Sequence, residues 1–539
     1  MTDAAAASAA AAGAPPAATP RPRIPWLGLS AVLLGTFIST LNGRLSTFGL
    51  ADIRGAVHAG FDEGAWITTA QTVAQMMVAP VAVWVGAIYG PRRVLIAAAL
   101  SYALISTLIP FSNGLPMFLG LQFLAGASSG FFVPLTLSFI LRSLPPKFWA
   151  YGIALYALNL ELSLNISASL EGWYVDHLSW RWIFWQNVPL AVGMAVCLHY
   201  GVARTPPDPK RPRTDLFGLA SAGIGLALIY AGLDQGNRLD WLNSGLVWGL
   251  LLAGGLLVIA FFVHEAVTPQ PLINLRVAVA PPLPRLLVLV AFLRLTILST
   301  AYLIPQYLQA VRGFRALQVG GTLMWIAAPQ LIFCPLAALM LRRTDPRLVS
   351  SIGFIFVSLA CLMVAHGLTP LWSSDEFMPS QLMQAVGQSF ALSGILFFAV
   401  LHLRPQDALT FGAAVQVARL MGGQLGQAFV VTLTRVRSQT ASNLIGLHIQ
   451  SGSGPVVQRL AAYAARGQSG DSVRDSARAA SLLGGVVRNA AATQGIIDSF
   501  VVVGVLTAVA LMLVVAHKPA PLGPASHRPL FGGRSGVAS

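Results

Sequence analysis

The feature that most constrains this chain is a succession of apolar runs, each about 20 residues long, which recurs between residues 26 and 517. A helix of about 20 mainly apolar residues is long enough to cross the hydrocarbon core of a bilayer. The chain is 55% hydrophobic and only 10% charged, whereas a soluble domain usually carries about 25% charged residues. The sequence therefore predicts an all-α integral membrane protein with many spans.

Fourteen such runs can be placed, and their order favours six spans, two linking helices and six more spans. The first six lie within residues 25–203, the linking helices within 204–264 and the last six within 265–517. Residues 1–24 are rich in Ala and Pro, which predicts a disordered N-terminus, and 518–539 form a tail. The predicted spans are 26–50, 65–89, 93–111, 116–141, 149–171, 182–203, 215–234, 244–264, 284–308, 316–341, 348–368, 378–402, 409–434 and 495–517.

The basic residues set the predicted orientation. With the N-terminus inside, the inside segments hold 19 of the 34 Lys and Arg residues, and the short outside loops hold 5. This asymmetry follows the positive-inside rule, so we expect an inner-membrane protein with both termini in the cytoplasm. Residues 435–494 are then one long periplasmic loop. In it, 456–465 and 472–483 favour short amphipathic helices at the outer surface, with a mobile connection or a docking surface for a partner as alternatives.

Several functional classes are excluded by missing motifs. The net charge of +15 does not indicate nucleic-acid binding, because only 3 of the 34 basic residues are Lys and the Arg residues lie between apolar runs. No Gly-rich loop ends in Gly-Lys-Ser/Thr, which an ATP-driven pump would need. Cys197, Cys334 and Cys361 lie in separate apolar stretches without metal-ligand spacing. We therefore expect neither an enzyme nor a metal or other cofactor.

Six short segments resemble a known family of transporters. The longest is Leu-Ser-Trp-Arg-Trp-Ile-Phe-Trp-Gln-Asn-Val-Pro, at the junction of the fifth and sixth spans. In chain order the segments are 178–189, 215–218, 233–241, 271–276, 304–309 and 419–426. Together they resemble the fourteen-span drug:proton antiporters of the major facilitator superfamily, the EmrB/QacA type, over roughly residues 25–517.

The resemblance implies the major facilitator fold and the export of small molecules in exchange for protons. The expected partners are a small-molecule substrate, protons and membrane lipid. In a Gram-negative host the resemblance also implies a periplasmic adaptor and an outer-membrane channel. No nucleic-acid partner is expected.

The chain departs from the family where protons and gating are concerned. Asn42 stands at the position of an acidic residue in span 1, and an amide cannot carry a proton. The loop after span 2 has Ala87 at its usual acid, and span 4 has Gln122 in place of Arg. The gating and motif positions that we single out are Gly90, Arg92, Arg93, Gln122, Gly126 and Arg419.

Ionisable side chains within spans mark functional candidates, because each costs about 2.5 kcal/mol or more unless it is paired or hydrated. We place only two acids there, Glu161 and Glu171, both in span 5, and take them as candidates for proton coupling. A pair of Glu161 with Arg44 of span 1 is predicted, with a static packing role for this pair as the alternative. Glu171 could instead be a water-accessible group near the outer interface.

The candidates for cavity or substrate contacts are Asn42, Arg44, Tyr156, Asn159, Asn165 and Arg294. Arg294 could also serve only as a packing donor, and Arg419 could snorkel to the cytoplasmic face. Because the span 1 acid is missing and two Arg residues are expected near the cavity, we predict an anionic or neutral amphipathic substrate such as an aromatic acid.

Three functions remain open on the sequence. The first is a proton-coupled exporter of amphipathic small molecules or aromatic acids. The second is an uncoupled or importing facilitator of small organic anions, which the changed motifs favour. The third is a membrane scaffold that transports nothing. Proton flux accompanying substrate movement separates the first from the second, and loss of efflux on gene deletion excludes the third.

Overall fold

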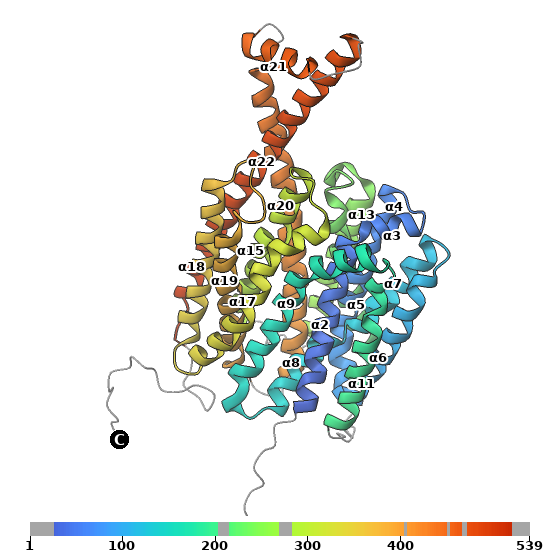
Figure 1. The fold of residues 1–539 in the computed structure, drawn as a ribbon. Helices are drawn as coiled ribbons and strands as arrows, with labels where there is room; N and C mark the ends of the chain where they lie inside the picture. The colour runs from blue at the N-terminus through green and yellow to red at the C-terminus, as the bar shows by residue number, and fades with distance from the viewer. Residues whose placement is uncertain are drawn as a thin grey trace, which may run out of the picture.

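The computed structural model describes residues 26–202, 215–268, 283–403, 407–449, 453–465 and 472–519, and these residues form helices and turns without any strand. Figure 1 shows most of the helices running side by side in one bundle. The helices are α2 (Trp26–Phe48), α3 (Leu50–Ala56), α4 (Phe61–Gly64), α5 (Trp66–Tyr89), α6 (Pro91–Leu108), α7 (Leu115–Ser129), α8 (Phe132–Ser143), α9 (Trp149–His177), α10 (Trp182–Trp185), α11 (Asn187–Gly201), α12 (Leu216–Gly236), α13 (Gly245–Val267), α15 (Leu283–Thr296), α16 (Ile304–Ala310), α17 (Ala316–Leu341), α18 (Pro346–Gly367), α19 (Met378–Val400), α20 (Ala408–Leu447), α21 (Gly454–Ala464) and α22 (Ser472–Val515).

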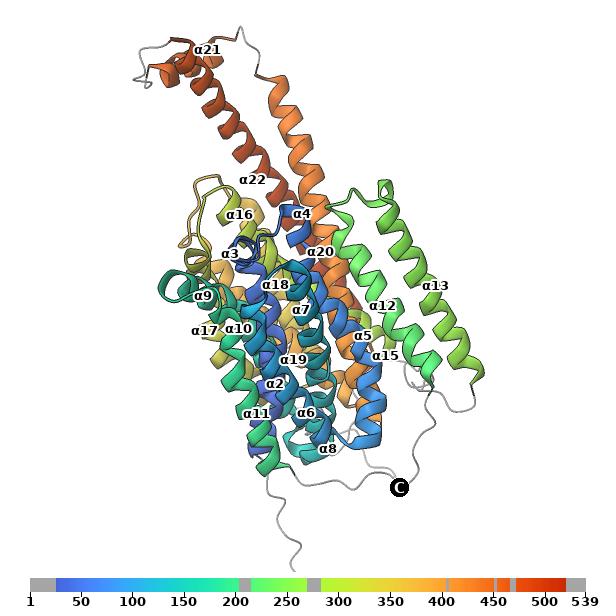
Figure 2. The same cartoon turned by 90° about the vertical axis from the view of Figure 1, so that its right-hand side faces the viewer.

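In the described part of the chain, 12 helical segments are long and apolar enough to cross a bilayer. The predicted spans 182–203 and 409–434 are not among them. The first consists of the short α10 followed by α11, which has only 15 residues. The second lies in α20, where Gln416, Arg419 and Gln424 are buried and lower the hydropathy. Both run alongside the other helices (Figures 1 and 2), so the all-α membrane fold is confirmed and is consistent with fourteen crossings.

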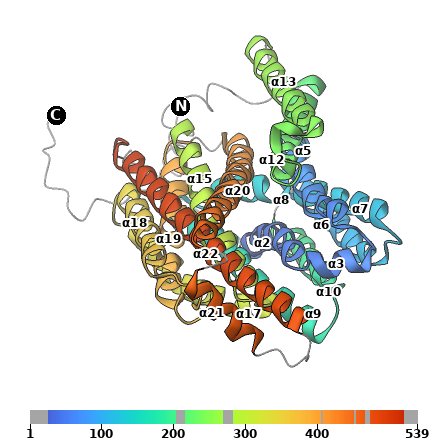
Figure 3. The same ribbon diagram turned by 90° about the horizontal axis from the view of Figure 1, so that it is seen from above.

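The helices up to α11 and those from α15 onward lie on opposite sides of the bundle, and we call these two groups the first and second halves (Figure 3). They meet along α9 and α17. Near one end of this seam, Arg342 donates a hydrogen bond of 2.6 Å to the Tyr151 hydroxyl. Near the other end, Gly172 and Gly320 approach the opposite backbone so closely that a Cβ atom would not fit. Small residues of this kind let membrane helices pack closely.

The linking helices α12 and α13 are not equivalent. Figure 3 shows α12 beside α5 and α20, with α13 on its outer side. Gly223 of α12 lies against the carbonyl of Met77 in α5, and Gln424 of α20 donates a hydrogen bond of 3.0 Å to Asp234 of α12. By contrast, only 17% of the apolar window of α13 is buried. Thus α12 closes the gap between the two halves, and α13 mainly faces lipid.

Residues 435–494, predicted as a long loop, are mostly helical where they are described. Helix α20 continues to Leu447 and α22 begins at Ser472, so both extend well beyond the bundle, with α21 at their tip (Figures 1 and 2). The predicted short helix 456–465 corresponds to α21, but 472–483 is the first part of the long α22. The abundant Ala and Arg of this region favour helix. We call the side from which α20 and α22 protrude the hairpin side.

Candidate functional site

A cavity of about 370 Å³ lies between the two halves, within the size range of small-molecule sites. Its wall is built from α2, α5, α9, α12, α15, α16 and α20 and from the turn between α15 and α16. Thr47 and Phe48 line it in the last turn of α2, and Thr68 lines it in the first turn of α5. On the opposite side of the bundle, Gly412 of α20 is pressed against the backbone of Pro134 in α8. The cavity therefore extends toward the hairpin side.

The charges that line the cavity are mostly positive. Arg44 of α2, Arg294 of α15 and Arg419 of α20 all contribute to the wall, and Asp234 of α12 is the acid among the described lining residues. Arg guanidinium groups can bind carboxylates through two parallel hydrogen bonds. Such groups could bind a carboxylate, and the anionic or neutral amphipathic substrate stays a prediction. Among the described residues, no three of His, Cys, Asp and Glu gather where they could hold a metal ion.

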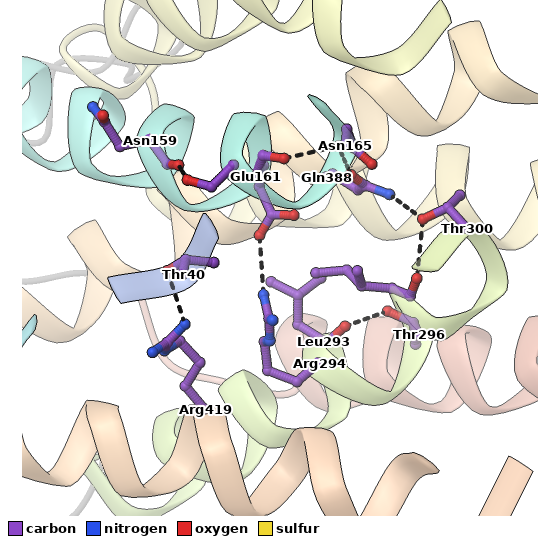
Figure 4. A network of polar contacts seen from close by, with 12 residues as sticks. Thr40, Asn159, Glu161, Asn165, Leu293, Arg294, Thr296, Thr300, Gln388 and Arg419 are labelled. Atoms are coloured by element: carbon purple, nitrogen blue, oxygen red, sulfur yellow. Dashed lines mark hydrogen bonds and ion pairs between the residues drawn. The ribbon is translucent and has the colours of Figure 1, made fainter. Parts of the chain in front are cut away.

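Glu161 pairs with Arg294, and this pair joins the two halves (Figure 4). The Arg294 Nη1 and Glu161 Oε1 atoms are 3.4 Å apart, with 0% of the Glu161 side chain and 12% of the Arg294 side chain exposed. The second carboxylate oxygen, Oε2, has no hydrogen-bond partner among the described residues. Glu161 is therefore connected to the cavity through Arg294, which lines it, while its own carboxylate lies behind the wall.

The predicted partner of Glu161, Arg44, is engaged elsewhere. Its guanidinium donates a hydrogen bond of 2.8 Å to the backbone carbonyl of Ala301 and lies 5.2 Å from the centre of the Phe48 ring. Ala301 belongs to a π-helical turn, Ser299–Leu303, where the regular hydrogen-bond ladder is interrupted. The prediction of a Glu161–Arg44 pair is wrong, because Arg44 reaches this turn of the second half instead.

Arg419 faces the cavity, and the alternative of snorkelling to the membrane edge is wrong. The side chain donates to Gln416 Oε1 from Nε at 3.2 Å and from Nη2 at 2.9 Å. Its Nη1 atom lies 3.4 Å from the Thr40 hydroxyl of α2 (Figure 4). The residue is only 5% exposed. Arg419 thus provides a further polar link between the halves beside the cavity, besides those of Arg294 and Arg44.

A set of buried amides also crosses between the halves. Asn165 of α9 donates to Gln330 of α17 at 3.2 Å and to Gln388 of α19 at 3.3 Å, and Gln388 donates to the Thr300 hydroxyl at 2.9 Å (Figure 4). Asn165 was predicted, but the two glutamines were not. The sequence contained a signal for these two glutamines, because a side-chain amide in an apolar span requires a hydrogen-bond partner just as a charge does. The network fixes the π-helical turn against α9.

Asn165 and three other predicted cavity residues lie outside the described cavity wall. Asn42 accepts a hydrogen bond of 2.9 Å from Asn187 of α11, inside the first half. Asn159 donates to the carbonyl one turn earlier in its own helix, at 2.9 Å. Tyr156 is fully buried, and its hydroxyl has no partner among the described residues. These residues contribute to helix packing rather than to the cavity surface.

Glu171 lies nearer the hairpin side on α9, and it does not line the cavity. Only 2% of the residue is exposed, so the alternative of a water-accessible group at the interface is wrong. Its Oε2 atom has no hydrogen-bond partner in the described part of the chain. A buried carboxylate without a partner is unfavourable, which keeps Glu171 a candidate for binding a proton.

Apart from Arg419, the motif positions lie outside the cavity wall. Gly90 has a φ of 80° between α5 and α6, a backbone conformation that favours glycine. Arg92 donates to two carbonyls in the last turn of α11, at 3.3 and 2.6 Å, while Arg93 lines an apolar groove over α5, α6 and α7. Gln122 is buried without a partner for its amide, and Gly126 lies against the backbone of α5.

The linking helix α12 contributes two cavity residues that the sequence analysis missed, Tyr230 and Asp234. Asp234 accepts hydrogen bonds from the Thr69 hydroxyl of α5 and from the Gln424 amide of α20, the latter at 3.0 Å. The expectation that only two acids lie within spans is therefore wrong. Asp234 was at the last position of the predicted span 215–234, and a linking helix was not expected to reach the cavity.

Comparison with known proteins places these features in a family. The sequence profile of the Major Facilitator Superfamily matches residues 32–429. The probable multidrug resistance protein EmrY of Escherichia coli is 26% identical over 66% of this chain and 68% of its own length. The E. coli multidrug export protein EmrB is 21% identical over 75% and 79%. The fatty acid resistance protein FarB of Neisseria gonorrhoeae is 22% identical over 92% and 96%.

Solved structures share the fold. The human organic anion transporter MFSD10 superimposes with a TM-score of 0.57 at 15% identity, over 92% of this chain and all of that one. The proton:xylose symporter XylE superimposes with a TM-score of 0.58 at 8% identity, over 91% and 95%. At such low identity the likeness concerns the arrangement of helices alone, and it agrees with the fold predicted from the sequence.

Proposed function

Because the chain belongs to the Major Facilitator Superfamily, we propose that it exports amphipathic small molecules, aromatic acids among them, across the inner membrane in exchange for protons. The names of its relatives EmrY, EmrB and FarB all refer to export of, or resistance to, toxic small molecules. Their similarity supports efflux as the direction of transport. The multi-pass helical bundle with a cavity between two halves is suited to alternating access around that cavity.

The observation that carries the involvement of protons in transport is the Glu161–Arg294 pair. It joins the two halves at 3.4 Å, so it has to break whenever the halves move apart around it. A proton on Glu161 removes the carboxylate charge and with it the ionic attraction to Arg294. A substrate anion on Arg294 can also take the place of Glu161. Either event releases the pair, whereas the empty, deprotonated protein keeps it.

The cavity charges support anionic substrates. Three Arg residues line the wall and one acid opposes them. In the low dielectric of a membrane protein interior, this excess of positive charge attracts a carboxylate more strongly than it would in water. The relative FarB is named for resistance to fatty acids, which are amphipathic acids. Aromatic or aliphatic acids of similar size are therefore the substrates to test first.

The hairpin supports the proposal of a periplasmic partner. Helices α20 and α22 protrude from the bundle on the side that the positive-inside rule places in the periplasm (Figure 2). Apolar side chains remain exposed on them, including Leu444, Leu447 and Leu482. We propose that a periplasmic adaptor binds here and delivers substrate to an outer-membrane channel.

Substrate-driven proton movement in proteoliposomes tests the proposal. Addition of an aromatic acid should move protons through the intact protein, and Glu161→Gln should abolish this movement while substrate binding persists. Glu171→Gln tests the second candidate in the same assay. Glu63→Gln is the matched control, because Glu63 is exposed at the start of the first half. Substrate movement without proton flux in every variant would instead support the uncoupled facilitator.

A further inference from the structure

Exchange of a substrate for a proton requires that the two exclude one another at some group in the protein, since the coupling between two ligands is reciprocal. The Glu161–Arg294 pair does not supply this exclusion. A proton on Glu161 and a substrate anion on Arg294 occupy different groups, so both can be held at the same time. A further acid that the substrate itself contacts would supply the exclusion directly.

Asp234 meets this requirement by its position. It is the acid among the described residues of the cavity wall, and it is only partly buried. Glu161 and Glu171 do not line the cavity. Asp234 sits on the linking helix α12, which closes the gap between α5 and α20 (Figure 3). A substrate in the cavity can therefore touch the carboxylate of Asp234 directly, but not those of the two acids on α9.

The hydrogen bonds of Asp234 hold its carboxylate in place without neutralising it. The donors are the Thr69 hydroxyl, the Gln424 amide at 3.0 Å and the Gln235 amide at 3.4 Å. All three are uncharged. The nearest Arg beyond the end of α12, Arg238, donates to Gln235 at 2.8 Å and pairs with Asp62 at 2.9 Å. Among the described residues, none of these donors to the carboxylate of Asp234 is a charged side chain.

Besides Asp234, the titratable side chains of the described cavity wall are those of Tyr230, Tyr302, Arg44, Arg294 and Arg419. Helix α12 adds the Tyr230 hydroxyl, α20 adds Arg419, and α5 contributes only the uncharged Thr68, Thr72 and Gln75 to the wall. Arg44 and Arg294 line the same cavity from α2 and α15. The cavity therefore has one acidic wall, formed by the linking helix, and several basic side chains on the helices of the two halves.

We propose that Asp234 and Tyr230 form the second part of the substrate site and bind an ammonium group of the substrate in competition with a proton. The substrate class is then an amphoteric molecule, with a carboxylate toward Arg294 and a protonated amine toward Asp234. When the amine arrives, the proton on Asp234 passes to the water of the cavity, and when the amine leaves, a proton returns. This inference rests on the proposed exchange function and names the class of substrate for it.

Three naphthalene probes of the same shape test the inference by binding to the purified full-length protein. They are 6-(aminomethyl)-2-naphthoate, which is a zwitterion, 6-ethyl-2-naphthoate, which carries only the carboxylate, and 2-(aminomethyl)-6-ethylnaphthalene, which carries only the amine. The intact protein should bind the zwitterion most tightly. Asp234→Asn should weaken binding of the zwitterion about tenfold or more, as loss of one charge-assisted hydrogen bond does. Its affinity for 6-ethyl-2-naphthoate should be unchanged or higher.

The controls separate a binding role from a packing role. Asp240→Asn removes the same charge from the exposed turn just after α12, where the side chain is 66% exposed, and should not change the preference for the zwitterion. The affinity of the intact protein for the zwitterion should fall as the pH is lowered, because protons compete, and Asp234→Asn should remove this dependence. If Asp234→Asn weakens all three probes equally, Asp234 only braces α5, α12 and α20, and the inference is overturned.

Two further outcomes are decisive. Binding of the probes could depend on sodium, show no preference for the amine and be abolished by Asp234→Asn. That result would assign the carboxylate to a metal ion and overturn the inference. If neither the zwitterionic probe nor the ethyl naphthoate binds or moves protons, the proposed function fails. Binding of the amine probe then tests the acidic site alone. Loss of amine binding in Asp234→Asn but not in Asp240→Asn would still support the acidic site, and retention of amine binding would refute it.

Discussion

Replacement of Arg294 by Gln should leave Glu161 as a buried carboxylate without its partner. Removal of one member of a buried ion pair typically costs about 3–5 kcal/mol of the free energy of unfolding. The N–O distance of 3.4 Å is long, and Arg294 keeps 12% of its side chain exposed, so we expect the low end, about 3 kcal/mol. The double variant Glu161→Gln with Arg294→Gln should recover most of this loss, because no unpaired charge remains.

The measurement is the free energy of unfolding of the purified protein, titrated with SDS in mixed micelles at pH 8. At pH 5 the loss in Arg294→Gln should be smaller, because a proton on Glu161 removes the unpaired charge. Arg44→Gln is the matched control. Arg44 donates to the Ala301 carbonyl and not to an acid, so its effect and that of Glu161→Gln should add within about 0.5 kcal/mol.

Two results would contradict this reasoning. One is a double variant whose loss equals the sum of the losses in Glu161→Gln and Arg294→Gln, which would mean that the two side chains are not coupled. The other is additive behaviour at Arg294 together with coupling at Arg44, which would restore the pair predicted from the sequence. The same cycle thus decides between the observed and the predicted partner of Glu161.

Gly126→Val should destabilise the protein by about 1–3 kcal/mol through overpacking, because a Cβ atom there would meet the backbone of α5, whereas Gly120→Val on the same helix meets nothing within 4 Å. Thermal melting of both variants in detergent compares them, and equal melting temperatures would refute the close packing. A membrane-impermeant thiol reagent should label Thr47→Cys from the hairpin side in intact vesicles, and a bound substrate should slow the labelling. The native Cys334 and Cys361 are 1% and 0% exposed and should not react, so faster labelling from the opposite side would contradict the cavity's direction.

The family and the fold could be predicted from the sequence, and the contacts of individual charges could not. Glu161 and Arg294 are 133 residues apart in the chain, and the predicted partner Arg44 is only 117 residues from Glu161. Sequence patterns place both arginines within predicted spans. The choice between them depends on helix rotation, since a shift of one residue turns a side chain by about 100° around the axis.

By itself the sequence determined that this is an all-α membrane protein, because hydropathy over about 20 residues is a local property that needs no knowledge of neighbours. It also predicted three Arg residues of interest, Arg44, Arg294 and Arg419, because charges are rare in spans. Only the tertiary structure decided that Glu161 pairs across the halves, that α12 brings Asp234 to the cavity wall, and that the described part of 435–494 is mostly helical. Those features arise from packing between distant segments, where side-chain direction and close backbone approach, rather than hydropathy, set the contacts.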